Sequence, residues 1–190
     1  SKIDRPIEIR NKKILIIGLG GIGVNTAERL KAFGAKIDAI SNDLIPLVSF
    51  IDKLYLSDNL NNIAKNYDII ICAAPLTKKT KYMLDYNFFK QMKKNSIFIN
   101  VSRGKIVKTK DLLKNSIYKK FRGIGLDVTD PEPLNEDNIL KKAPNIFITP
   151  HMAGPSDYNR LRGFELVKEN ILRYLKGDNL LNIVDKNKGY

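Results

Sequence analysis

Apolar, β-branched runs of strand length alternate with helical patterns along almost the whole chain. Most of these runs are continuously apolar, as strands covered on both faces of a sheet should be. Strands separated by helices are typical of a parallel, doubly wound α/β sheet with right-handed crossovers. The pattern predicts strands over 13–17, 36–40, 53–56, 68–73, 96–101, 123–127 and 145–149, and helices over 21–33, 59–66, 86–94 and 109–119.

A last, longer helix is predicted from about residue 156 to residue 176. Its apolar side chains recur at helical spacing and form one stripe, and Gly177 would end it. The polar tail 178–190 follows. We expect one domain over 1–177 and a separate tail. The stripe consists of Leu161, Phe164, Val167, Ile171 and Leu175.

The composition is that of a globular protein large enough to bury one core. The chain has 190 residues, of which 43% are hydrophobic, and no apolar run approaches the length of a membrane span. No cleavable signal is visible at the start. Cys72 is the single cysteine, so no internal disulfide can form. These features suit a reducing cytoplasm, and we expect a cytoplasmic protein with no membrane partner.

The net charge of +13 raises the question of a nucleic-acid or anionic-membrane partner. The lysines, however, are spread along the chain in short pairs such as Lys12-Lys13, and no base-stacking aromatic residues interleave with them. Isoleucine and asparagine are abundant as well, which indicates a general compositional bias. We therefore predict no nucleic-acid partner, although the charge can help to attract anionic substrates and cofactors.

The motif ILIIGLGGIG follows the first predicted strand and opens the first predicted helix. It contains Gly18-x-Gly20-x-x-Gly23, with Gly21 and Ile22 inside the pattern. Gly18 permits a tight turn, Gly20 lets the backbone approach a pyrophosphate, and Gly23 lets helix and strand pack closely. The helix N-terminus then presents N–H groups to the anion. In this context the motif predicts a Rossmann-type dinucleotide site.

The choice between NAD and NADP depends on the end of the second predicted strand. Asp38 has about the spacing expected of a ribose-binding acid, but it lies inside the strand. Ser41 is therefore the candidate ribose-facing residue. A serine does not accept two ribose hydroxyl bonds and does not repel a 2′-phosphate, which favours NADP. No arginine follows directly, and Asp43 would oppose the phosphate, so the choice stays open.

Four further blocks make the chain resemble the D-isomer-specific 2-hydroxyacid dehydrogenases, a family that includes glyoxylate, hydroxypyruvate and phosphoglycerate dehydrogenases. The resemblance runs from about residue 9 to residue 182. Ser41 is a departure, since the family's NAD users have aspartate there. The blocks are AAPLTKKT at 73–80, NVSRG at 100–104, GLDVTDPEPL at 125–134 and ITPHMAG at 148–154.

The resemblance implies roles for individual residues. Arg103 matches the arginine that grips the substrate carboxylate and keto oxygen. His151, the only histidine, matches the general acid/base, and Glu132 matches its carboxylate partner. Asp127 matches the residue beside the nicotinamide. Further positions that line the cofactor are matched by Ala74, Pro75, Thr80 and Val101.

The chemistry of three of these residues agrees with those roles. The planar fork of Arg103 suits bidentate binding of a carboxylate. His151 can supply the proton that reduction of a ketone needs, and the nearby carboxylate of Glu132 favours the charged imidazolium. Each of the three, taken alone, is also typical of an ordinary surface turn. Together, beyond strand ends in a cofactor-binding fold, they predict catalysis.

The resemblance leaves two functions open. The family's usual chain begins with a substrate-binding domain of on the order of 100 residues, which precedes the glycine loop and which the C-terminal tail rejoins. We expect this domain to be absent, by excision or truncation. The first function is NAD(P)-dependent reduction of a small 2-keto acid by a homodimer. The second is a non-catalytic dinucleotide-binding module, like the family's co-repressor relatives, or a degenerate remnant.

Overall fold

The structure is a computed structural model that describes residues 5–41 and 48–189. The chain forms two compact units, Ser1–Pro150 and His151–Tyr190, and each unit is described by itself. The predicted division into a binding domain, 1–177, and a tail, 178–190, stays a prediction.

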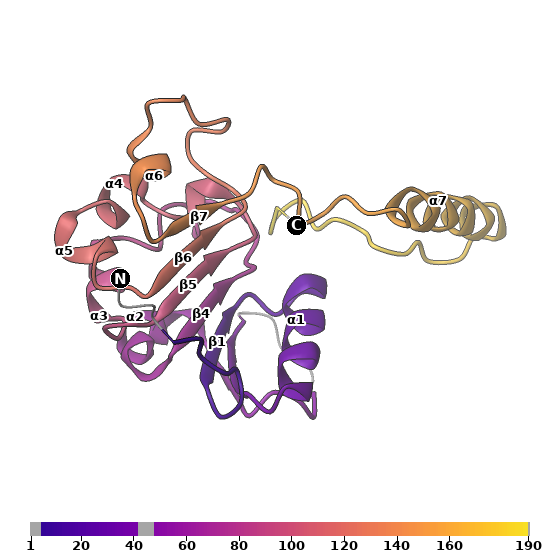
Figure 1. The fold of residues 1–190 in the computed structure, drawn as a ribbon. Coiled ribbons are helices and arrows are strands. Elements are labelled where there is room, and N and C mark those ends of the chain that lie inside the picture. Colours follow the sequence, from indigo (N-terminus) through magenta and orange to yellow (C-terminus); the bar gives the residue numbers. More distant parts are fainter. Residues whose placement is uncertain (1–4, 42–47, 190) are drawn as a thin grey trace. The chain divides into compact units, whose positions relative to one another are not determined.

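The first unit contains a seven-stranded parallel sheet with the strand order β3-β2-β1-β4-β5-β6-β7 (Figure 1). All seven predicted strands are present, and each boundary lies within one residue of its prediction, which confirms the doubly wound α/β class. The strands are β1 (Lys13–Ile17), β2 (Lys36–Ile40), β3 (Lys53–Tyr55), β4 (Ile69–Cys72), β5 (Ile97–Asn100), β6 (Gly123–Leu126) and β7 (Ile146–Ile148).

The helices of this unit are shorter than the sequence pattern predicts. Only α1 keeps nearly its predicted length. The predicted helix 59–66 is a series of one α-helical and two 3-10 segments, and the predicted helix 109–119 breaks at Lys114, where ψ is 131°. The segments are α1 (Gly21–Ala32), η1 (Ser57–Asn59), α2 (Leu60–Ile63), η2 (Ala64–Asn66), α3 (Tyr86–Gln91), η3 (Gly104–Ile106), α4 (Thr109–Leu112), α5 (Asn115–Tyr118) and α6 (Ile139–Lys142).

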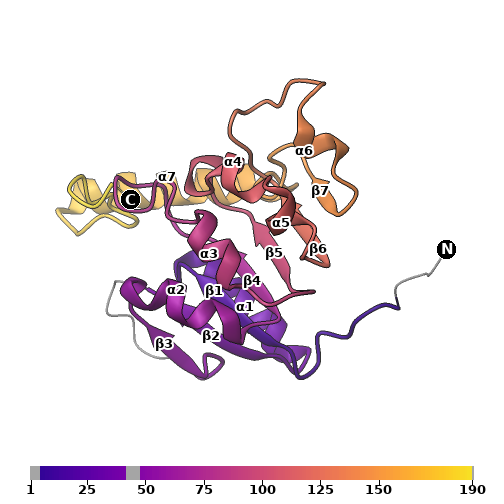
Figure 2. The same ribbon diagram turned by 90° about the vertical axis from the view of Figure 1, so that its left-hand side faces the viewer.

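The sheet is buried on both faces, which explains its continuously apolar strands. Along β1, Ile14 and Ile16 pack in the cluster that includes Ala27 of α1, while Leu15 and Ile17 pack in the cluster on the opposite face. That opposite face is covered by α2, α3 and α5 (Figure 2). Its centre holds three phenylalanine rings in edge-to-face contact, which belong to Phe88, Phe89 and Phe98.

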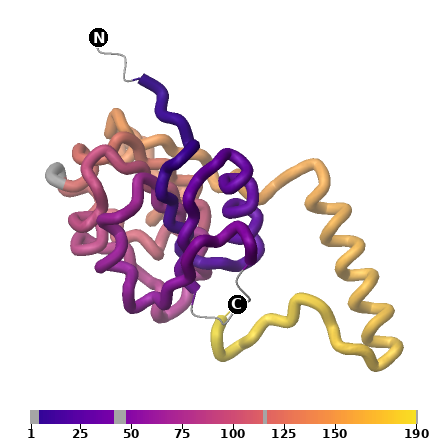
Figure 3. Tube along the Cα trace, turned by 90° about the horizontal axis from the view of Figure 1, so that it is seen from below, coloured from indigo at the N-terminus to yellow at the C-terminus, as the bar shows by residue number. Residues whose placement is uncertain are grey.

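The second unit consists of α7 (Asn159–Lys176) and the segment that follows it. The helix starts three residues later than predicted. It ends as predicted at Gly177, whose φ of 78° is left-handed, and the N–H of Asp178 bonds the carbonyl of Arg173 at 2.9 Å. The tail then turns back (Figure 3) and exchanges two hydrogen bonds between Leu181 and the Asn170 amide.

The apolar stripe of α7 is not covered within its own unit. No residue of the helix is buried, and all five stripe residues are more than half exposed, from 55% for Leu161 to 74% for Leu175. None of the described helices is both long and apolar enough to cross a membrane. An amphipathic helix of this kind is stable only when its apolar side packs against another surface.

We expect Asp111→Asn to destabilise the first unit by about 1 kcal/mol at neutral pH, because the ion pairs it removes involve half-exposed lysines and such pairs contribute about 0.2–1 kcal/mol each. The Asp111 carboxylate accepts a bond from the N–H of Tyr86 and pairs with Lys114 at 3.1 Å and Lys108 at 3.4 Å. Burial alone would raise the pKa of Asp111, but the Lys114 and Tyr86 bonds outweigh it and lower the pKa.

The sign of the pH dependence follows from this direction. A carboxyl whose pKa is depressed on folding stabilises the protein above its unfolded pKa of about 3.9, and this stabilisation is lost as the pH falls through the folded value. The difference between wild type and Asp111→Asn, measured by urea denaturation, should therefore shrink in acid. Exposed Asp137 gives the matched control, Asp137→Asn. A difference that stays constant from neutral to strongly acidic pH would contradict the role of the ion pairs.

Candidate functional site

The order of the strands reverses between β1 and β4, and Gly18 lies at this point. In open α/β sheets ligands bind beyond the carboxyl ends of the strands where the order reverses. Gly18 follows β1 with a φ of +95°, and a Cβ there would lie 2.5 Å from the Cα of Ala74, which follows β4. Gly18 is therefore required for two reasons, the left-handed backbone and the close contact between the two strand ends.

The N-terminus of α1 is open to an anion. Gly20 is the N-cap, no side chain caps the helix, and its first turn contains no acidic residue. A Cβ at Gly20 or Gly21 would meet no atom within 4 Å, whereas a Cβ at Gly23 would lie 2.1 Å from the carbonyl oxygen of Gly18. The loop thus combines tight packing behind the helix with free space in front of its N–H groups, and it fits a pyrophosphate.

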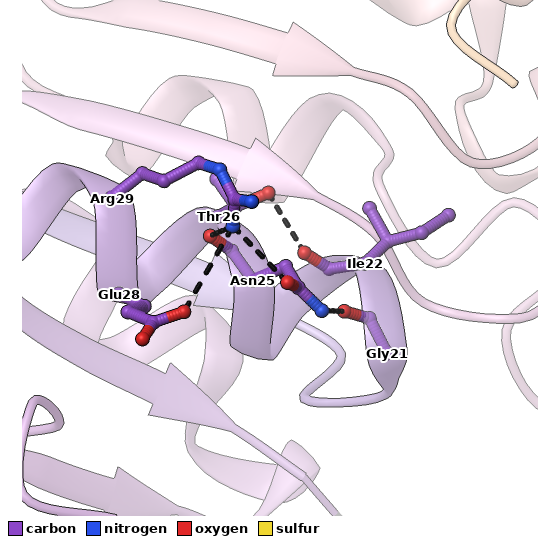
Figure 4. Close-up of polar contacts among 6 residues, drawn as sticks. All are labelled: Gly21, Ile22, Asn25, Thr26, Glu28 and Arg29. Atoms are coloured by element: carbon purple, nitrogen blue, oxygen red, sulfur yellow. Dashed lines mark hydrogen bonds and ion pairs between the residues drawn. The ribbon is translucent and has the colours of Figure 1, made fainter. Parts of the chain in front are cut away.

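Three polar side chains of α1 donate to carbonyl oxygens of their own helix (Figure 4). Asn25 donates to the carbonyl of Gly21, Thr26 donates to that of Ile22, and Arg29 donates to that of Asn25, each at 2.8 Å. The side chain of Ile22 is 58% exposed. The predicted loop residues therefore leave the helix end accessible.

Ser41 and Asp38 differ in position as the sequence predicts. Asp38 lies in the middle of β2, and its carboxylate accepts a bond of 2.6 Å from the hydroxyl of Tyr67. Burial and this carboxylate raise the pKa of Tyr67, so the phenol remains a donor. Ser41 is buried directly beyond β2, and its N–H bonds the carbonyl of Tyr55. Asp43 lies outside the described residues.

The loop after β4 is held by a threonine hydroxyl. Thr80 donates to the carbonyl of Pro75 at 2.6 Å and accepts from the N–H of Thr77 at 2.7 Å. Ala74 is buried and Pro75 is exposed. The structure thus assigns Thr80 a role in shaping this loop, and the contact of these residues with a cofactor stays a prediction.

Asn100 shapes the turn that carries Arg103. The sequence did not lead us to predict this role. Its amide is fully buried, donates to the carbonyl of Arg103 and accepts from the N–H and the hydroxyl of Ser102. Arg103 is exposed and donates to the carbonyl of Ser102 at 2.7 Å. Val101 bonds the carbonyl of Cys72 through its N–H. A lone amide at the end of the apolar strand IFIN was the available signal.

Gly104 allows the turn that carries Arg103 to pack against the loop after β6. This role was not predicted from the sequence either. A Cβ at Gly104 would lie 1.8 Å from the carbonyl oxygen of Thr129, so no other residue fits without moving one of the two segments. Asp127, directly beyond β6, is buried and accepts a bond of 2.5 Å from the Thr149 hydroxyl. Arg103 and Asp127 thus lie beyond the ends of two adjacent strands.

Glu132 and His151 belong to different units. Glu132 lies in the loop after β6, where its carboxylate accepts a bond of 3.4 Å from the N–H of Thr129. His151 is the first residue of the second unit. Its φ of 52° is left-handed, which is uncommon outside glycine and typical of turns and functional sites. The pairing of His151 with Glu132 stays a prediction.

Comparisons with known proteins identify the family of this chain. Residues 2–153 match the profile of the D-isomer specific 2-hydroxyacid dehydrogenase, NAD binding domain. The chain is 33% identical over 186 residues to a glyoxylate reductase of Thermofilum pendens, covering 94% of the chain and 53% of that protein. It is 32% identical to a D-3-phosphoglycerate dehydrogenase of Methanocaldococcus jannaschii, covering 94% of the chain and 34% of that protein.

Among solved structures, the chain resembles the NADPH-dependent glyoxylate/hydroxypyruvate reductase of Sinorhizobium meliloti in complex with NADP and sulfate. The TM-score is 0.86 at 28% identity, and the match covers 100% of this chain and 60% of that one. The chain thus spans about half the length of most of the curated relatives it matches. By its profile match, its fold and its glycine loop, the chain belongs to the D-isomer specific 2-hydroxyacid dehydrogenase family, as that family's NAD-binding domain.

Proposed function

We propose that this chain supplies the cofactor-binding half of an enzyme that reduces a small 2-keto acid to the D-2-hydroxy acid with NAD(P)H. One observation carries the proposal. The glycine loop, Arg103 and Asp127 follow β1, β5 and β6 respectively, at the one edge of the sheet where the carboxyl ends of parallel strands meet. The cofactor cradle and the candidate substrate-binding arginine therefore share that edge.

The residues that would hold the cofactor follow the order of the strands. The loop from Gly18 to Gly23 would bind the pyrophosphate at the N-terminus of α1, and Ser41 would face the adenosine ribose. The bound nicotinamide supplies the hydride or accepts it. The remaining contacts would come from Ala74, Pro75, Thr80, Val101 and Asp127.

The chain's own side chains bind the substrate and move the proton. The guanidinium of Arg103 binds the substrate carboxylate through two parallel hydrogen bonds and orients the keto group. His151, as imidazolium, donates its proton to the keto oxygen during reduction and takes it back in oxidation. Glu132 favours the charged imidazolium and fixes its orientation.

The direct test is an assay of the natural protein that contains this chain, with NADPH or NADH and with glyoxylate or hydroxypyruvate. We expect oxidation of the reduced cofactor that depends on the keto acid, and D-glycerate from hydroxypyruvate. Formation of L-glycerate would contradict the D-isomer assignment. Cofactor binding without turnover of any small 2-keto acid would instead indicate a non-catalytic dinucleotide-binding module.

We further propose NADP over NAD and expect Ser41→Asp to shift the preference towards NADH. An aspartate beyond β2 would accept ribose hydroxyl bonds and repel a 2′-phosphate. The ratio of the two dissociation constants should change by about tenfold or more, because hydrogen bonds to charged groups contribute about 1.5–3 kcal/mol and about 1.4 kcal/mol is tenfold. Fluorescence titration with both reduced cofactors measures the ratio. An unchanged ratio removes Ser41 from this role.

We also propose that the protein is a homodimer that forms through this half, because the stripe on α7 is uncovered within its unit. Sedimentation at micromolar concentration should show a dimer, and Phe164→Glu, in the middle of the stripe, should weaken it. Glu165→Gln on the same helix is the matched control, because it leaves the stripe apolar. A clean monomer for the unmodified protein would contradict dimerisation by this half.

We also propose that the protein is located in the cytoplasm. Cys72, the single cysteine, is fully buried, and burial raises the pKa of its thiol, as suits a packing residue in a reducing compartment. Cell fractionation tests the location, and recovery of the protein outside the cytoplasmic fraction would contradict it.

A further inference from the structure

Tyr82 has a backbone conformation that its own side chain does not favour. Its φ is 55°, in the left-handed region where bulky residues are rare, and such a conformation is strained. Burial of the ring does not account for it, because Tyr82 is 38% exposed. A strained residue of this kind persists only where contacts with its surroundings fix it. The hydrogen bonds of Tyr82 identify these contacts.

Two hydrogen bonds link Tyr82 to the turn that carries Arg103 and to the loop that carries Glu132. Its N–H bonds the carbonyl of Lys105 at 2.8 Å, two residues beyond Arg103. Its hydroxyl donates to the carboxylate of Asp130 at 2.9 Å, two residues before Glu132. That bond raises the pKa of Tyr82, so the phenol keeps its proton and remains a donor at neutral pH.

Tyr82 is also tied to the loop that carries Thr80. The N–H of Met83, its neighbour, bonds the carbonyl of Thr80, and the N–H of Leu84 bonds the carbonyl of Ile106. The segment around Tyr82 is therefore bonded on one side to the loop that carries Thr80. On the other side it is bonded to the residues that follow Arg103. The side chain then reaches from this fixed segment to the loop after β6.

Other contacts also hold the loop after β6. The hydroxyl of Thr109 donates to the carbonyl of Asp130 at 3.2 Å, and Gly104 packs against the backbone of Thr129. Both contacts involve the backbone of the loop. The Tyr82 hydroxyl instead holds the Asp130 side chain, next to the turn that presents Glu132.

We propose that Tyr82 is a positioning residue for keto-acid reduction, which holds the loop of Glu132 in register with the turn of Arg103 through its hydrogen bond to Asp130. This inference rests on the proposed function. Tyr82 contacts neither substrate nor reacting atoms in this role. It acts through Glu132, whose carboxylate must stay where it favours the imidazolium of His151.

The test compares Tyr82→Phe, which removes only the hydroxyl, with Asp130→Asn, which keeps an acceptor oxygen. The matched control is Tyr55→Phe, which removes a hydroxyl from the last residue of β3, the outermost strand on the side of the sheet away from β6. Amide hydrogen exchange of residues 127–133 is measured first, on this chain alone. We expect faster exchange in Tyr82→Phe than in the wild type, the control or Asp130→Asn.

Kinetics of the natural protein then separate positioning from mere support of the fold. Tyr82→Phe should lower kcat by about tenfold, since small misplacements of catalytic groups cost up to about 10²-fold, while KM for the reduced cofactor stays unchanged. The pH above which turnover falls should move lower, because the imidazolium loses part of its carboxylate support. Asp130→Asn still accepts the hydrogen bond of Tyr82, so its kcat and its pH profile should stay close to those of the wild type.

The outcomes distinguish this inference from the proposed function. An active wild type with an unchanged kcat and pH profile in Tyr82→Phe would overturn the positioning role, even if hydrogen exchange became faster. Loss of kcat with an equal loss in Tyr55→Phe would overturn it as well. Absence of turnover in the unmodified protein would overturn the proposed function itself, and the positioning role with it.

Discussion

His151→Gln is expected to lower kcat for keto-acid reduction by about 10²–10⁴-fold, the usual contribution of general acid catalysis, while the affinity for the reduced cofactor stays nearly intact. Glutamine keeps much of the side chain's size and hydrogen bonding but cannot give up a proton near neutral pH. His151 follows β7 directly after Pro150 and has a left-handed backbone. The measurement is steady-state kinetics with hydroxypyruvate together with a separate titration of the cofactor.

Two companion variants of the same protein identify the partners of His151. Glu132→Gln should move the fall in turnover to lower pH, because a neutral amide no longer favours the imidazolium. Arg103→Lys keeps the positive charge but loses the bidentate fork, so both KM for the keto acid and kcat should suffer. Near-normal turnover of His151→Gln would end the proposed mechanism and leave a dinucleotide-binding domain with another task.

Gly18→Ala is expected to destabilise the first unit by about 2–5 kcal/mol and to weaken cofactor binding strongly. A left-handed alanine costs roughly 1–2 kcal/mol, and overpacking costs typically about 1–3 kcal/mol more. The added Cβ would lie 2.5 Å from the Cα and 2.6 Å from the N of Ala74. Both are backbone atoms, so relief requires β1 and β4 to separate at the binding edge.

Gly21→Ala is the matched control for Gly18→Ala. It adds the same methyl group three residues later, at the start of α1, where a Cβ meets no atom within 4 Å. We expect Gly21→Ala to unfold at the same urea concentration as the wild type. If Gly18→Ala is as stable as Gly21→Ala, the strand ends are not packed as the structure shows.

The strands were predictable because their signal is local. In β1 and β4 nearly every residue is apolar, since each faces one of two buried layers, and the prediction was correct to within one residue. The helix predicted over 109–119 was less predictable. It breaks at Lys114, whose ammonium lies 4.3 Å from the centre of the Tyr86 ring. Such a contact with a residue 28 positions earlier leaves no periodic pattern in the sequence.

The candidate site was only partly predictable for the same reason. The glycine loop has a local spacing that a sequence reveals, and Arg103, Glu132 and His151 were found through resemblance to the family. Gly104 and Tyr82 were missed because their roles depend on contacts with segments distant in the chain. Asn100 was missed although its partners, Ser102 and Arg103, are close in the sequence. Gly104 lies against Thr129, and Tyr82 bonds Asp130, 48 residues later. Nothing in their immediate neighbours indicates such partners.

The most direct test of the dinucleotide site is calorimetric titration of the 190-residue chain with NADPH and, separately, with NADH. The cradle lies entirely within the first unit, between β1, β4 and α1, so binding should not require the remainder of a longer relative. We expect saturable binding of at least one cofactor at millimolar concentration or below, and loss of this binding in Gly18→Ala. No binding of either cofactor at millimolar concentration by a folded chain would contradict the site.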